Sequence, residues 1–117
     1  MSQINLGSKA FIAGEDLEVN RRVKLSSGSG DTVEYADAGE AFIGITASKV
    51  VSGDFVTIEL KTSGRTFKLV VDGAVSVGGD IYGANDGKVG ATVSGSIIGK
   101  VLEEATADSE VVEGILF

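Results

Sequence analysis

The sequence predicts an all-β fold, a small barrel or sandwich of short antiparallel strands with little helix. Three observations predict it. The 117 residues include 17 glycines and no proline, with frequent Val, Ile and Thr, a composition that favours short strands joined by tight turns. Apolar and polar residues alternate in several short runs. Segments rich in Gly, Asn, Asp and Ser separate these runs. The length suits one domain.

The chain is expected to begin with an N-terminal arm over residues 1–12, followed by a single β domain over residues 13–117. Ile4 and Leu6 are spaced by two, but polar and glycine residues interrupt the pattern. The arm is therefore interpreted either as a strand that needs a pairing partner or as a frayed terminus.

The first half of the domain contains a predicted hairpin and two further strands. Apolar alternation on both sides of the loop Ser26–Asp31 indicates the hairpin. Residues 41–47 form a candidate buried strand, in which Gly44 indicates a bulge or a close approach of two backbones. Over residues 56–60, Val, Ile and Leu alternate with Thr and Glu, as in a half-buried strand.

The second half repeats this style of pattern. Candidate strands cover residues 67–71, 75–77, 80–82, 96–104 and 111–117. Asn85-Asp86-Gly87 predicts a tight hairpin turn, because Asn and Gly tolerate the positive φ that such a turn needs. Helix is limited to single turns at residues 36–41 and 102–108, since neither has a helical apolar stripe of sufficient length.

The two halves align loosely with each other at a period of about 55–58 residues. Leu17, Val19 and Val23 correspond to Val75, Val77 and Ile81; residues 42–45 correspond to 97–100, and 54–56 to 110–112. Two similar β-modules would then close one barrel or sandwich. The alternative is chance self-alignment of sequences rich in Val, Ile and Gly.

Composition argues against several classes of function. With 10 Lys+Arg against 17 Asp+Glu, the net charge of −7 disfavours nucleic-acid binding. No apolar run approaches the ~20 residues of a membrane span, so no membrane partner is expected. The chain has no His, Cys or Trp, which removes the commonest general base, the commonest zinc ligand and any disulfide.

We accordingly expect no enzyme, and no catalytic, cofactor-binding or metal-binding residues, cofactor or small-molecule substrate. A serine nucleophile would lack a histidine base. The carboxylate clusters read as solvated turns. The spacing of Asp80, Asn85 and Asp86 does not match a calcium loop. The glycines of residues 73–87 are too dispersed for a phosphate cradle.

The second half resembles the capsid cement, or head decoration, proteins of tailed bacteriophages. The resemblance covers about 45 residues and is carried by a series of short motifs in order: Gly73-Ala74-Val75-Ser76-Val77, Gly79-Asp80-Ile81-Tyr82, Asp86-Gly87-Lys88-Val89, Ile98-Gly99-Lys100-Val101-Leu102, Ala105-Thr106-Ala107-Asp108 and Val111-Val112. The first half carries a weaker version, with Gly14, Ile43-Gly44 and Ser52-Gly53-Asp54. Gly114 departs from the family pattern, which has an apolar residue there, and the arm is short for the family.

The resemblance implies a β-barrel or β-tulip domain that assembles as a homotrimer on the outer capsid surface of the virion, after synthesis in the host cytoplasm. Its partner would be the major capsid protein, whose lattice it would stabilise. Members often reach the capsid through an N-terminal arm; here that implies Ile4, Leu6 and Phe11 as apolar anchors. Strand addition to a sheet edge and threefold avidity would supply the affinity.

The alternative function is a carbohydrate- or receptor-binding β-module of a phage tail or cell surface. Such sites usually present exposed Trp or Tyr side chains, and this chain has no Trp and two Tyr.

Overall fold

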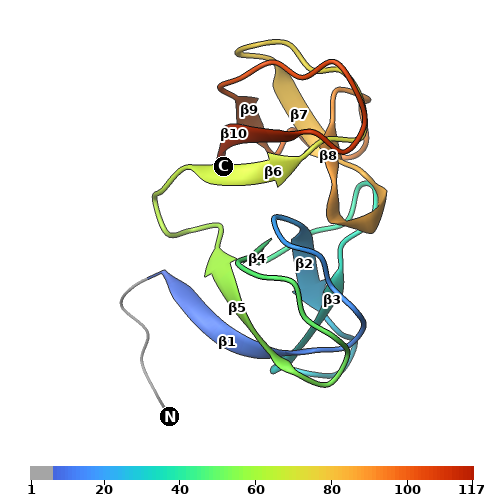
Figure 1. Ribbon diagram of the computed structural model, residues 1–117, viewed down its shortest axis with the longest axis vertical. Coiled ribbons are helices and arrows are strands. Elements are labelled where there is room, and N and C mark those ends of the chain that lie inside the picture. The colour runs from blue at the N-terminus through green and yellow to red at the C-terminus, as the bar shows by residue number, and fades with distance from the viewer. Residues whose placement is uncertain (1–6) are drawn as a thin grey trace.

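The computed structural model describes residues 7–117, and over these residues the chain is built from β-strands and one short 3-10 turn (Figure 1). The elements are β1 (Ser8–Ala13), β2 (Arg22–Leu25), β3 (Thr32–Tyr35), β4 (Gly44–Thr46), β5 (Phe55–Leu60), β6 (Phe67–Val70), β7 (Asp80–Gly83), η1 (Asn85–Gly87), β8 (Val89–Gly90), β9 (Gly99–Val101) and β10 (Val111–Leu116). The predicted all-β class with little helix is confirmed.

The strands form two lobes stacked along the longest axis of the molecule (Figure 1). Lobe 1, residues 8–60, is a closed barrel in the order β1-β3-β2-β4-β5. Lobe 2, residues 67–117, is a five-stranded sheet in the order β6-β10-β9-β7-β8. Strand pairs are antiparallel except for β1 with β3. In lobe 2 the matching parallel contact is reduced to one bridge, Val71 with Val89.

The two lobes repeat one another in topology and in register, which confirms the repeat predicted from the sequence. Phe11 pairs with Val56 in lobe 1, as Leu69 pairs with Val112 in lobe 2. The isolated bridge between Leu17 and Val50 matches the bridge between Val75 and Ala105. The pairing of Val23 with Gly44 matches that of Ile81 with Gly99. The offset stays within about 55–58 residues throughout.

A glycine at the start of β4 and of β9 is required by the packing of each lobe. A Cβ on Gly44 would lie 2.3 Å from the carbonyl oxygen of Glu59 in β5. A Cβ on Gly99 would lie 2.0 Å from the carbonyl oxygen of Ile115 in β10. Neither distance is sterically possible, so the close backbone approach predicted at Gly44 is confirmed and recurs at the equivalent glycine.

Lobe 1 has its own core, whereas the core of lobe 2 includes residues of lobe 1. The lobe 1 core consists of Phe11, Ala13, Leu17, Val23, Val33, Val56 and Ile58. In the second cluster, Ala36, Phe42 and Ile45 of lobe 1 pack with the buried residues of lobe 2. Since burying one aliphatic or aromatic side chain contributes about 1.5–3 kcal/mol, this shared cluster joins the lobes into one folding unit.

Several strand limits differ from the prediction. Residues 41–47 contain only the three-residue β4, and residues 96–104 contain only β9. The single turns of helix expected at residues 36–41 and 102–108 are not formed. The hairpin turn at Asn85-Asp86-Gly87 is present as η1, closed by a hydrogen bond from Ala84 N to Lys88 O at 2.9 Å.

The predicted boundary between arm and domain needs correction. Residues 8–13 form β1, which pairs with β5 from Ser8 to Ile12 and with β3 at Ile12 and Ala13. The barrel therefore begins well inside the predicted arm of residues 1–12, because its apolar alternation is satisfied within the chain. Over the described residues, no helix is long and apolar enough to cross a membrane.

Candidate functional site

Of the three predicted capsid anchors, the structure describes only Phe11. Ile4 and Leu6 lie outside the described residues. Phe11 is 6% exposed and packs in the lobe 1 core, so it holds β1 in the barrel and is not an available anchor. An alternating strand shows which residues share a face but not whether that face is covered, so sequence alone did not reveal the burial of Phe11.

The junction between the lobes is organised around one buried arginine. Arg22 is 0% exposed. Its Nε donates to Lys88 O at 2.9 Å, and its Nη2 donates to Ala84 O at 2.6 Å and to Ala36 O at 3.0 Å. The guanidinium also lies over the Phe42 ring, 5.3 Å from its centroid. Arg22 thus ties backbone of lobe 2 to backbone of lobe 1 with charge-assisted hydrogen bonds.

Burial lowers the pKa of Arg22 to about 10, against the opposing effect of the Asp37 and Glu40 charges. The side chain therefore remains cationic at neutral pH. The glycine of β7 next to it, Gly83, leaves the space that the guanidinium fills, since a Cβ there would lie 2.8 Å from Nη1. Nothing in the sequence around Arg22 indicates this role.

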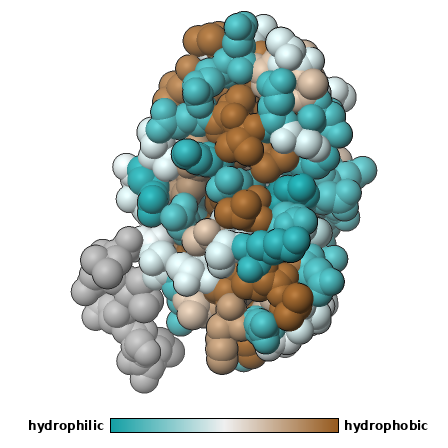
Figure 2. Space-filling model, viewed as in Figure 1, coloured by the Kyte–Doolittle hydropathy of each residue, from teal (hydrophilic) through white to brown (hydrophobic). Residues whose placement is uncertain are grey.

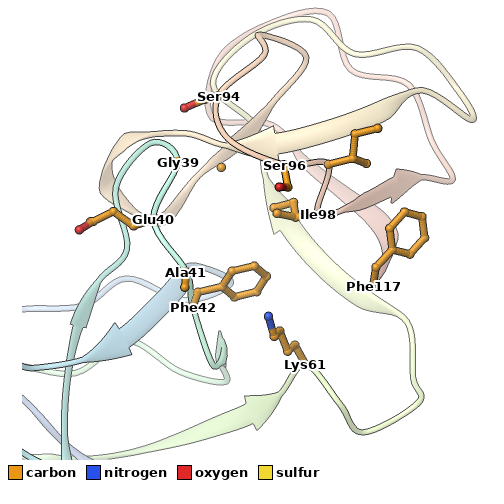
Figure 3. A pocket seen from close by; sticks show the side chains of 11 residues that line it. Gly39, Glu40, Ala41, Phe42, Lys61, Ser94, Ser96, Ile98 and Phe117 are labelled. Carbon is orange, nitrogen blue, oxygen red and sulfur yellow. The ribbon is translucent and has the colours of Figure 1, made fainter.

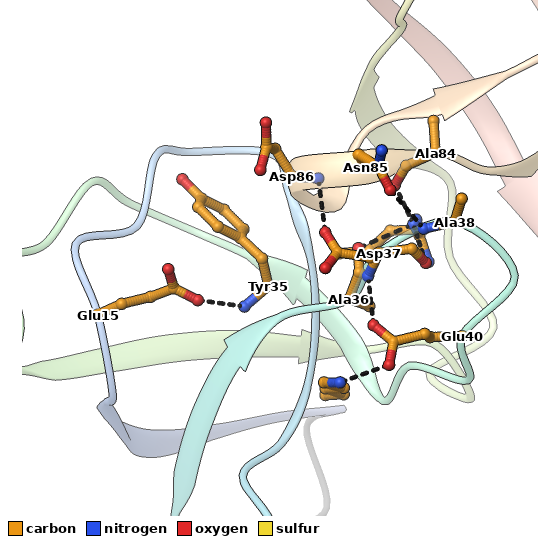
Figure 4. A network of polar contacts seen from close by, with 11 residues as sticks. Glu15, Tyr35, Ala36, Asp37, Ala38, Glu40, Ala84, Asn85 and Asp86 are labelled. Atoms are coloured by element: carbon orange, nitrogen blue, oxygen red, sulfur yellow. Dashed lines mark hydrogen bonds and ion pairs between the residues drawn. The ribbon is translucent and has the colours of Figure 1, made fainter.

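A polar network surrounds this arginine and fixes η1 on lobe 1 (Figure 4). Asp86 N donates to the Asp37 carboxylate at 3.0 Å, and Ala38 N donates to Asn85 Oδ1 at 3.1 Å. Gly87 N donates to the carbonyl of Ala36 at 3.0 Å. The Asn-Asp-Gly turn therefore serves two purposes, because it closes the β7–β8 hairpin and holds the two lobes together.

The carboxylate of Glu40 extends this network. It accepts from Asp37 N at 2.8 Å and forms an ion pair with Lys24 Nζ at 2.5 Å. These contacts, the Lys24 hydrogen bond above all, hold the pKa of Glu40 below its ordinary value. The arrangement stabilises the loop that carries Asp37 and Glu40.

A groove of about 270 Å³ lies between the lobes (Figure 3). Phe42 of lobe 1 and Lys61, which directly follows this lobe, line it opposite Ile98 and Phe117 of lobe 2. The Lys61 Nζ lies 4.8 Å from the centroid of the Phe42 ring. The lining is mainly apolar, with one cation, one carboxylate from Glu40 and two serines, Ser94 and Ser96, so it offers contact area with a few polar groups. Over residues 7–117, no group of three His, Cys, Asp or Glu residues could hold a metal ion.

The outer face of the β1–β5 pair is a second candidate surface. Phe55 is 74% exposed and is the cross-strand partner of Ile12. Ala10 and Thr57, the next outward-facing partners, are also exposed and carry no charge. Figure 2 shows hydrophobic surface on the lobe that holds these strands. Sequence reasoning missed Phe55, although the alternation predicted for residues 56–60 places it on the polar side.

No protein-family model matches the chain, and no curated protein sequence matches it either. Among solved structures, the chain is similar to the N base of head fiber gp8.5 of bacteriophage phi29, known from a crystal structure, with a TM-score of 0.80. The match covers 94% of this chain and 92% of that chain at 17% sequence identity. The two proteins therefore share a fold over nearly their whole described length.

Proposed function

We propose that the protein is a structural component of a phage head, a cement or decoration protein that binds the outside of the capsid as a homotrimer and stabilises the lattice of the major capsid protein. The observation that carries the proposal is the likeness, over 94% of the chain, to the base of a phage head fiber. The family resemblance of residues 73–112 supports it independently.

The chemistry of the chain is compatible with this role. The two lobes are joined by a shared hydrophobic cluster and by buried, charge-assisted hydrogen bonds. The groove and the exposed β1–β5 face offer contact area with a large apolar share. Such surfaces suit the binding of another protein, in which apolar contact area and shape complementarity dominate.

The test is a binding experiment on capsids. The purified protein is mixed with heads of the phage that encodes it, prepared without it, and the sedimented fraction and the thermal midpoint of head disruption are measured. We expect saturable binding, a higher midpoint of head disruption, and a trimer by native mass measurement on the free or head-bound protein. Heads that neither bind the protein nor gain stability would contradict the proposal.

The alternative, a carbohydrate- or receptor-binding module, gains no specific support from the tyrosines. Tyr35 is half-buried and its hydroxyl accepts from Glu18 N at 2.8 Å, and Tyr82 is also half-buried. Neither forms an exposed stacking platform. Clear hits on a glycan array would favour this alternative.

A further inference from the structure

The repeat allows each surface of lobe 1 to be compared with its equivalent on lobe 2, and the β1–β5 face differs most from its counterpart. In lobe 2 the positions equivalent to Ala10 and Thr57 are Lys68 and Glu113, which face each other across β6 and β10 and are both exposed. A cross-strand pair of opposite charges is the usual way to keep such a face in water. Lobe 1 has lost both charges at the same structural positions.

The apolar residues on this face, in contrast, are larger and more exposed in lobe 1 than in lobe 2. Phe55, 74% exposed, occupies the position of Val111, which is 51% exposed. Ile12 is half-buried, whereas its equivalent, Val70, is 6% exposed. The same strand pair thus presents a larger apolar area in lobe 1 without the charges that solubilise it in lobe 2. An exposed aromatic in an uncharged setting is typical of the centre of a protein interface.

The rim of this face is acidic at the C-terminal end of β1. Asp31 and Asp54 lie on either side of the end of β1, because Ile12 N donates to Asp31 O at 2.7 Å and Ala13 N donates to Asp54 O at 2.9 Å. Both residues are exposed. Hydrogen bonds from Ser29 and Thr32 lower the pKa of Asp31, so this carboxylate is charged at neutral pH. Within residues 7–117, neither carboxylate forms an ion pair.

We infer that the outer face of β1 and β5 is the docking surface for a protein partner that presents an apolar contact surrounded by Lys or Arg. The charge of the rim decides between occupants. A second copy docked face to face would bring the same acidic rims together, at a cost from like-charge repulsion. A basic-rimmed partner would instead pair with Asp31 and Asp54 while Phe55 is covered. The inference rests on the proposed function. It adds that lobe 1 faces the capsid and that the capsid surface around the contact is basic.

The experiment compares matched variants on the same capsids. Phe55→Ser removes the central aromatic, and Val111→Ser makes the equivalent change on lobe 2. Both side chains are mostly exposed, so both variants should keep the thermal midpoint of the wild type. We expect Phe55→Ser to weaken binding to decoration-free heads at least tenfold and Val111→Ser to leave it within twofold, because truncating a central aromatic is costly only where a partner covers it.

A second pair of measurements tests the rim. Wild-type binding should weaken as salt is raised from 50 to 300 mM, and Asp54→Lys should weaken binding further at low salt. Three outcomes would each overturn the inference: wild-type affinity of Phe55→Ser, tighter binding of Asp54→Lys, or a change in native mass on Phe55→Ser that identifies a second copy as the occupant. If the wild-type protein does not bind heads, both the proposed function and this inference are wrong. A difference between variants on heads that the wild type does bind tests the inference alone.

Discussion

The two lobes share one strand topology but differ in barrel closure and in the composition of their cores. Lobe 1 is a closed barrel with its own core, whereas lobe 2 is an open sheet whose core includes Ala36, Phe42 and Ile45 of lobe 1. At the position of the buried Arg22, lobe 2 has Asp80, half exposed and paired with Lys100 at 2.6 Å. Positions that backbone geometry fixes are therefore shared between the lobes, while those that join the lobes or lie on the proposed docking face have diverged.

The largest effect is expected from removing β1. Deleting residues 1–12 removes Phe11 and most of the strand that closes the barrel between β3 and β5, so the protein should lose cooperative unfolding altogether. Deleting residues 1–6 leaves β1 intact and should preserve the unfolding transition. Circular dichroism melting curves of the two truncations give the comparison. A cooperative transition of unchanged midpoint after deletion of residues 1–12 would show that lobe 1 does not depend on β1.

The next largest effect is expected at the junction. Arg22→Met removes three charge-assisted hydrogen bonds. It leaves the carbonyl of Ala84 without that donor, while the carbonyls of Ala36 and Lys88 keep their backbone donors, so the free energy of unfolding should fall by about 3 kcal/mol. The matched change in lobe 2, Asp80→Asn, breaks an exposed ion pair and should cost about 0–1 kcal/mol. Urea unfolding measures both. Equal losses at the two equivalent positions would contradict the difference between the lobes.

The equivalent glycines should instead behave alike. Gly44→Ala and Gly99→Ala each force a Cβ into the backbone of the neighbouring strand and should destabilise the protein by about 1–3 kcal/mol. Gly73→Ala is the control, because no atom lies within 4 Å of a Cβ built there. Thermal midpoints of the three variants test this. A neutral effect at one of the two glycines would mean that the repeat does not extend to this packing contact.

The smallest effect is the pH dependence that the Lys24–Glu40 pair of lobe 1 contributes. The Lys24–Glu40 pair has no counterpart in lobe 2, where the equivalent residues are Tyr82 and Gly95. Because Glu40 has a lower pKa in the folded protein than its ordinary value of 4.5, the pair contributes stability above that pH and loses it as the pH falls through the folded-state pKa.

Glu40→Gln should therefore show a shallower loss of stability below pH 4.5 than the wild type, measured as the urea midpoint from pH 7 to pH 3. Glu104→Gln serves as the control, since Glu104 is exposed and forms no ion pair within residues 7–117. Identical slopes for Glu40→Gln and the wild type would exclude a contribution from the pair.

Much of the fold was predictable because it depends on local rules. The alternation of residues 56–60 and the Asn-Asp-Gly turn each reflect short-range geometry. The recurrence of Ile-Gly at residues 43–44 and 98–99 was visible because both lobes need a glycine at the same packing contact. The buried state of Arg22 and of Phe11 was not predictable in this way. Both depend on which distant strands close around them, and an isolated arginine or an alternating strand carries no such signal.

Of the two candidate surfaces, the β1–β5 face could be predicted in part from the sequence, and the groove between the lobes could not. Phe55 stands out once β5 is known to be a strand, because its parity places an aromatic on the solvent side. Its significance emerges only from the comparison with Val111, which needs the register of both strand pairs. The groove between the lobes could not be foreseen, since it is formed by segments of both lobes that only the packing of lobe 1 on lobe 2 brings together.

We propose above that the protein binds the surface of a phage head and docks through lobe 1. A cryo-electron microscopy map of heads reconstituted with the purified protein tests it most directly. We expect density for the protein as a trimer on the outer capsid surface, with β1 and β5 of lobe 1 against basic residues of the major capsid protein and lobe 2 further from the shell. Bare heads at saturating protein, or density in which lobe 2 makes the capsid contact, would contradict it.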